Sequence, residues 1–245
     1  MSLPEIVSEQ QWLTARRELL TREKDLTRQR DALNADRRRL PMVRVANDYR
    51  FTGPDGEARL LDMFQGRRQL VIQHFMFDPD WDAGCPGCTS GADELSEGLL
   101  RHLAARETSF AAISRAPYPK IETVKKAKGW TFAWYSSYGS RFNYDFHVSL
   151  DSSIAPIMFN YRDPAELEQA GLGWVTEKPM EQPGVSCFLR DGDDIFHTYS
   201  TFGRGTEGFT DAYQILDMTA LGRQEAWEEP KDRATAAHAA MPDFA

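Results

Sequence analysis

Two cysteines lie three residues apart in the segment Cys85-Pro86-Gly87-Cys88. A pair at this spacing can close and open a disulfide when one thiol ionises readily. Proline suits the first position of a helix, so we expect Cys85 at the N-cap and Cys88 one turn further along. There a Cys85 thiolate would accept hydrogen bonds from the N–H groups of Gly87 and Cys88 and feel the positive helix end. The motif therefore predicts a lowered pKa for Cys85, with Cys85 attacking and Cys88 resolving.

Two other interpretations of the pair stay open. The cysteines could be inert core residues, or they could form half of a zinc site, since tetrahedral zinc accepts Cys and His ligands. A second Cys-x-x-Cys is absent from the sequence, and Cys187, His74 and His197 are scattered along it. Cys187 alternates with apolar neighbours, which favours burial over a third redox role. We therefore favour a redox pair and expect no metal and no cofactor.

The elements around the motif are typical of an α/β protein. The near-continuous apolar run at 69–77 suits a central strand covered on both faces. Strand, helix and strand over 69–114 imply a parallel crossover. The other expected elements are a hairpin over 42–64, a helix over about 119–128, aromatic residues at 130–147 that favour a core over a cleft, a hairpin of 185–190 and 195–200, and a last helix near 209–216.

Residues 8–40 read as one long polar helix that begins with a Ser8 and Gln11 capping box. Apolar residues recur every seven positions on it, at Trp12, Leu19, Leu26, Leu33 and Leu40. The companion heptad positions are mostly charged or polar, whereas a coiled coil needs two apolar positions per heptad. We therefore expect the stripe to pack on the body of the protein or on a second subunit, as in a homodimer.

Some residues near the motif could support its chemistry. Sites in doubly wound sheets gather at the carboxyl ends of parallel strands, and Arg115 follows such an end. Its charge could lower the pKa of Cys85, although an ordinary surface arginine fits equally well. Trp81, with Asp78, Asp80 and Asp82, precedes the motif and could shape its mouth, but we favour a plain solvated loop.

Four segments together resemble a bacterial family of uncharacterised thioredoxin-like proteins. They are His74-Phe75-Met76-Phe77-Asp78, Cys85-Pro86-Gly87-Cys88, Trp134 to Ser140 with Phe142 to Phe146, and Phe196 to Thr201. The order of elements is similar to the thioredoxin-like fold, and the upstream hairpin looks closer to its peroxiredoxin and thiol-reductase branch. The resemblance covers about residues 10–225. It implies an α/β, three-layer fold with a mixed central sheet, and a dithiol role for Cys85 and Cys88.

The chain departs from the thioredoxin pattern at two places. Thioredoxin has Cys-Gly-Pro-Cys, whereas Pro86 and Gly87 stand in the reverse order here. Thioredoxin also has a cis-proline before its hairpin, where this chain has Gly184 with Pro183 beside it. The motif and the segment before the hairpin therefore differ from those of thioredoxin.

The organisation expected from these observations is an N-terminal helical extension over 1–40, a thioredoxin-like domain over 41–228 and a flexible tail over 229–245. Residues 151–183 contain four prolines and are expected to be an insertion or an irregular segment.

The composition narrows the partners and the function. The net charge of −8 gives no reason to expect nucleic acid or an anionic membrane. No apolar run could span a bilayer and the N-terminus does not read as a secretory signal, so we expect a cytoplasmic protein. The predicted function is a thiol–disulfide oxidoreductase that uses an unknown disulfide or peroxide and a thiol reductant. The alternative is a non-catalytic binding or scaffold protein with a remnant cysteine pair.

Overall fold

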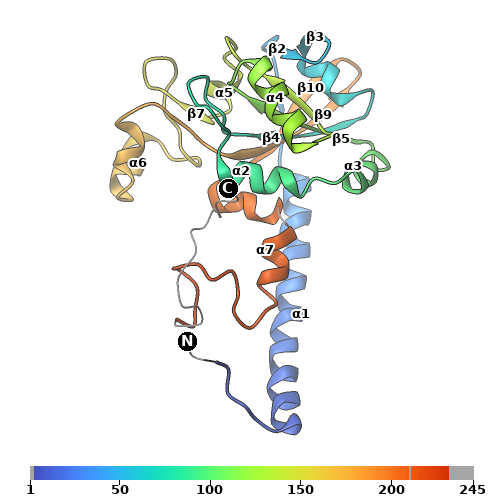
Figure 1. Ribbon diagram of the computed structural model, residues 1–245, viewed down its shortest axis with the longest axis vertical. Helices are drawn as coiled ribbons and strands as arrows, with labels where there is room; N and C mark the ends of the chain where they lie inside the picture. Colours follow the sequence, from blue (N-terminus) through green and yellow to red (C-terminus); the bar gives the residue numbers. More distant parts are fainter. Residues whose placement is uncertain (1–2, 210, 232–245) are drawn as a thin grey trace.

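The computed structural model describes residues 3–209 and 211–231, built around one large sheet (Figure 1). The sheet has eight strands in the order β1-β10-β9-β4-β5-β6-β2-β3. Their bounds are β1 Val43–Arg44, β2 Arg50–Gly53, β3 Gly56–Arg59, β4 Gln69–His74, β5 Thr108–Ser114, β6 Ala133–Ser136, β9 Gly184–Asp191 and β10 Asp194–Phe202. A small second sheet pairs β7 (Ser149–Leu150) with β8 (Met180–Glu181).

Strand directions identify the fold. β4, β5 and β6 are parallel, whereas β9 is antiparallel to β4 and β10 is antiparallel to β9. The crossovers between the parallel strands are helical, through α2 (Pro86–Asp93) and α3 (Glu97–Ala104), then through α4 (Tyr118–Lys128). A βαβ unit joined to a hairpin on its other side, in the order β10-β9-β4-β5, is the thioredoxin-like arrangement. The predicted fold class, with a mixed central sheet and a long N-terminal helix, is confirmed.

Apolar side chains pack on both faces of the sheet, so the sheet is the middle one of three layers and helices lie on either side of it. On one face, Phe75 and Trp134 pack with Cys88 of α2. On the other, Ile72 packs with Phe142 of α5 (Phe142–Asp145). β4 supplies side chains to both clusters, as its near-continuous apolar run predicts. Trp134 and Phe142 are both fully buried, so these two aromatic residues belong to the core rather than to an open cleft.

Three local predictions differ from the structure. The helix expected to run on from Cys88 stops at Asp93, because Ser96 begins a new helix by accepting a hydrogen bond from the Leu99 N–H (3.1 Å). Within 42–64, only β2 and β3 form a hairpin, while β1 pairs with β10 at the opposite edge of the sheet. The last helix of the described residues is α7, Asp211–Leu216, after a 3₁₀ segment at Gly203–Phe209.

The segment 151–183 is less irregular than the sequence indicates. It contains α6 (Pro164–Gln169), a 3₁₀ turn at Gly173–Thr176 and strand β8. Ile157, Leu167 and Val175 of this segment, which we call the lobe at 151–183, form a separate buried cluster with Leu150 of β7. The four prolines of this segment suggested irregular structure. Pro164, however, occupies the first turn of α6, where proline is favourable, and so does not disrupt a helix.

The N-terminal helix α1, Glu9–Arg39, projects far beyond the sheet (Figure 1). Its Ser8 and Gln11 capping box is present, as predicted. None of its residues is buried, and the apolar stripe stays 46 to 66% exposed from Trp12 to Leu40. The expected packing of the stripe against the body of the same chain is therefore wrong.

No described helix combines the length and apolar character that crossing a bilayer requires. The tail expected over 229–245 lies outside the described residues beyond 231.

We propose that the stripe packs against a second copy of this chain. α1 carries nine basic and six acidic residues and so has a net charge of +3. Because the whole chain has a net charge of −8, the residues outside α1 have a net charge of −11. This opposite charge favours contact between α1 of one copy and the body of another. Wild-type protein should have twice the 27.9 kDa mass of one chain in light scattering. Leu19→Glu should give a monomer, whereas Thr21→Glu, about 200° further around the helix, should not. A monomeric wild type contradicts the proposal.

Candidate dithiol site

The end of β4 and the first turn of α2 position the cysteine pair. After β4 the chain turns back, and the Cys85 N–H donates to the Met76 carbonyl (2.9 Å). Gly84 passes so close to the Phe75 ring that a Cβ at this position would lie 2.5 Å from it. α2 then begins at Pro86, and both the N–H and the hydroxyl of Thr89 donate to the Cys85 carbonyl (2.9 and 3.0 Å). Cys85 is therefore the N-cap residue, as the motif predicts.

The two thiols have different surroundings. Cys85 is half-buried, whereas Cys88 is 6% exposed and its Sγ accepts a hydrogen bond from the Met76 N–H (3.4 Å). A hydrogen bond from the Cys88 thiol, aided by the N–H groups of Cys88 and Gly87 and opposed by burial, lowers the pKa of Cys85 to about 6. The same hydrogen bond, together with burial, raises the pKa of Cys88.

The two pKa shifts arise largely from the contact between the two thiols. The Cys88 thiol makes the largest contribution to the low pKa of Cys85, and the backbone contributes less because the Cys85 side chain makes no well-aligned capping hydrogen bond. A pKa of about 6 favours the thiolate form of Cys85 at neutral pH, and the raised pKa of Cys88 favours its thiol form. A half-buried thiolate beside a protonated partner suits nucleophilic attack followed by resolution.

Arg115 does not act on Cys85. Its Nη1 donates to Glu181 Oε1 (2.6 Å) and to Asp78 Oδ2 (3.2 Å), and its guanidinium lies 5.2 Å from the centre of the Tyr144 ring. The groups that shift the pKa of Cys85 are Cys88, Gly87 and burial, with no contribution from Arg115. The arginine instead ties the lobe at 151–183 to the loop that precedes the motif.

The loop before the motif is held by backbone contacts. The ammonium group of Lys120 donates to the carbonyls of Pro79 (2.7 Å) and Trp81 (3.0 Å). The Trp81 side chain is 37% exposed. This arrangement agrees with the solvated loop favoured by the sequence.

Gly184 is brought next to the motif by the sheet. It pairs with His74 in β4, and a Cβ there would lie 2.9 Å from the Phe202 ring and 3.2 Å from Val148. Pro183 and Gly184 line one cavity together with Gly87 and Cys88. Three of the predicted site residues, Gly87, Cys88 and Gly184, therefore share this cavity, whereas Cys85, Pro86, Trp81 and Arg115 lie outside its lining.

Sequence reasoning missed Gln73 as a residue of this site. Its side chain lines the same cavity and is 7% exposed. A signal was present, because a polar residue in a strand covered on both faces is unusual. Phe209 and Tyr213 also line the cavity. Their apolar spacing identified a helix, but it did not indicate which surface that helix would cover.

The third cysteine, Cys187, and His74 are held inside the sheet. Cys187 lies opposite Val71 in β4, and burial raises the pKa of its thiol. His74 is 1% exposed and shares a hydrogen bond with the Ser186 hydroxyl (2.7 Å). Within residues 3–209 and 211–231, no group of three His, Cys, Asp or Glu side chains is arranged to hold a metal ion.

Comparison with solved structures finds similarity to peroxiredoxins. Peroxiredoxin Q of Xanthomonas campestris has 14% sequence identity to this chain and a TM-score of 0.45, with 71% of this chain and 92% of that chain covered. Peroxidoxin BcpB of Mycobacterium tuberculosis has 17% identity and a TM-score of 0.38, with 69% and 93% covered. No curated protein matches the chain. A family model described as "bacterial protein of unknown function (DUF899)" matches residues 1–240, and the chain belongs to this family.

Proposed function

We propose that the protein is a thiol–disulfide oxidoreductase that uses Cys85 and Cys88 as its dithiol. The observation that carries this proposal is the opposite shift of the two pKa values, with Cys85 lowered to about 6 and Cys88 raised. A buried pair with only a structural role would gain nothing from a thiolate. All three cysteines are unpaired, which fits a cytoplasmic setting, where thiols are kept reduced.

The reaction has two exchange steps. The Cys85 thiolate attacks one sulfur of the substrate disulfide, forms a mixed disulfide and releases the other half as a thiolate, which takes up a proton. Cys88 then loses its proton and attacks the Cys85 sulfur, closing the Cys85–Cys88 disulfide and releasing the second half as a thiol. Two electrons pass from the dithiol to the substrate. A thiol reductant of the cell reverses the oxidation of the pair, itself becoming a disulfide.

Turnover of a small disulfide tests the proposal, with dithiothreitol as reductant and thiol release as the readout. Cys85→Ser should lower the rate to the uncatalysed level, because serine supplies no thiolate. Cys187→Ser should keep the wild-type rate and serves as the matched cysteine control. Equal rates for wild type and Cys85→Ser would rule out the proposed role. Hydrogen peroxide in place of the disulfide shows whether Cys85 also reduces a peroxide.

Counting thiols after mild oxidation separates this function from a binding or scaffold role. If Cys85 and Cys88 are redox-active, two of the three thiols should be lost on oxidation and recovered with reductant. A scaffold with remnant cysteines should keep all three.

A further inference from the structure

The cavity beside Cys88, the resolving cysteine, is large enough for a small organic molecule. It has a volume of about 250 Å³ and lies between α2, the start of β9 and the C-terminal segment. Gly87 and Gly91 of α2 leave room where larger side chains would fill the space, and Val185 and Phe209 supply apolar surface. A cavity of about 150 Å³ already holds benzene. The space therefore suits a ring or a short alkyl group.

One buried polar atom in this cavity is without a partner. The Nε2 group of Gln73 donates weakly to the Cys88 carbonyl (3.5 Å), and its Oε1 has no hydrogen-bond partner among the described residues. Turning the amide around would bring its oxygen against the Cys88 carbonyl oxygen, so this orientation of the amide is the favourable one. A buried acceptor left unsatisfied destabilises the fold. Oε1 itself has almost no accessible surface, so a rotation of the Gln73 side chain toward the cavity is what presents this acceptor to a ligand that brings an N–H or O–H.

The C-terminal segment covers the cavity. We call residues 203–209 and 211–216 the roof. The Glu94 carboxylate of the segment between α2 and α3 accepts hydrogen bonds from the N–H groups of Asp211 and Ala212, the latter at 3.2 Å. Phe209 also stacks on Phe110 of β5, with 5.7 Å between ring centres. The roof is therefore attached to the same layer that carries the cysteines.

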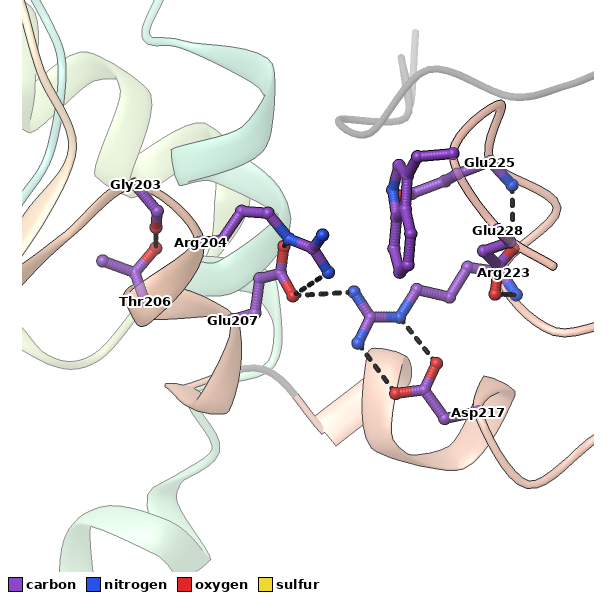
Figure 2. A network of polar contacts seen from close by, with 9 residues as sticks. Gly203, Arg204, Thr206, Glu207, Asp217, Arg223, Glu225 and Glu228 are labelled. Atoms are coloured by element: carbon purple, nitrogen blue, oxygen red, sulfur yellow. Dashed lines mark hydrogen bonds and ion pairs between the residues drawn. The ribbon is translucent and has the colours of Figure 1, made fainter. Parts of the chain in front are cut away.

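A charged network, part of which lines the cavity, holds the roof in place (Figure 2). Arg223 is only 9% exposed and donates twice to Asp217 (2.8 and 2.7 Å) and once to Glu207 (2.9 Å). Arg204 also donates to Glu207 (2.7 Å), so this roof carboxylate lies between two guanidinium groups. Figure 2 shows both arginines converging on it.

We propose that this cavity binds the non-reacting part of the substrate, and that the substrate is a small disulfide with an apolar body and a hydrogen-bond donor. The inference rests on the proposed function and narrows its substrate class. Gln73 determines specificity by accepting the hydrogen bond of the donor. The roof excludes protein disulfides by occupying the space next to the pair.

The experiment compares matched probes on wild type, Gln73→Leu and Gln69→Leu. Gln69 is an exposed glutamine of the same strand, outside the cavity lining, and controls for the change of residue type. Bis(4-aminophenyl) disulfide carries the donor, diphenyl disulfide lacks it, and an unstructured peptide disulfide tests size. Aniline and toluene, which contain no sulfur, are titrated calorimetrically as binding probes.

Wild type and Gln69→Leu should turn over the amino disulfide with a kcat/KM about threefold to tenfold above that of diphenyl disulfide, the range expected of one hydrogen bond. They should also bind aniline more tightly than toluene. Gln73→Leu should lose both preferences, and the peptide disulfide should be the poorest substrate.

Two results would overturn the inference and leave the proposed function intact. One is turnover without a preference for the amino disulfide or for aniline, and the other is turnover in which the peptide disulfide is the best substrate. In either case the cavity would hold only water. An aniline preference that Gln73→Leu abolishes, without turnover of any disulfide, would overturn the proposed function and the substrate claim together.

Discussion

Replacing Cys88 with alanine should raise the pKa of Cys85 from about 6 toward 9.0, because the hydrogen bond from Cys88 is the largest of the contributions that lower it. If the pKa rises the whole way, the thiolate fraction of Cys85 at pH 7 falls from about 90% to about 1%. The reactivity of Cys85 should fall with it, although the backbone N–H groups of the helix start remain. The variant thus separates the contribution of the second cysteine from that of the helix.

The measurement is the rate of iodoacetamide alkylation against pH, in a Cys187→Ala background so that Cys85 dominates the signal. Since a lowered pKa means thiolate above that pH, the rate in the parent should rise through a midpoint near pH 6. In Cys88→Ala the rise should move to higher pH. A midpoint that stays near 6 would show that the backbone alone lowers the pKa. A parent midpoint near 9 would contradict the site as described.

Replacing Arg115 with methionine should destabilise the fold by about 3–5 kcal/mol at pH 8, the cost of removing one partner from a buried ion pair. Glu181 is 4% exposed and is held by Arg115 (2.6 Å) and by the Ser149 hydroxyl (2.8 Å). Methionine fills similar space but brings no charge, so the carboxylate stays buried without its cation. Urea unfolding measures the loss.

The effect of this variant should depend on pH. Burial already raises the pKa of Glu181 against the effects of Arg115 and Ser149, and loss of the arginine raises it further. A carboxyl group whose pKa is raised by folding stabilises the folded state below its unfolded pKa and loses that contribution as the pH rises through the folded pKa. The variant should therefore lose less stability at pH 5 than at pH 8.

Two controls accompany the arginine variant. Arg141→Met removes an exposed pair with Asp145 (3.6 Å) and should cost less than about 1 kcal/mol. Adding Glu181→Gln to Arg115→Met removes the buried charge and should restore much of the loss. If Arg115→Met costs no more than Arg141→Met, the buried pair does not stabilise the lobe.

The sequence by itself determined the local features. Pro86 placed Cys85 at a helix start because proline fits the first turn, and the apolar run of β4 indicated a strand covered on both faces. Ser8 and Gln11 likewise marked the start of α1. Such signals depend on a few neighbouring residues, so they can be read without knowing what packs against them.

Only the tertiary structure decided which distant residues share the site. Gln73 and Phe209 come from β4 and the C-terminal segment, and sheet pairing with helix packing brings them to Cys88. Arg115 has a charge that suited the dithiol, but nearby carboxylates from two other segments neutralise it. The low pKa of Cys85 depends most on its contact with Cys88. The spacing of the motif brings the two thiols within hydrogen-bond reach. The position of α2 above β4 determines how far the two thiols are buried and which backbone groups bond to them, and so how far the pKa of Cys85 falls.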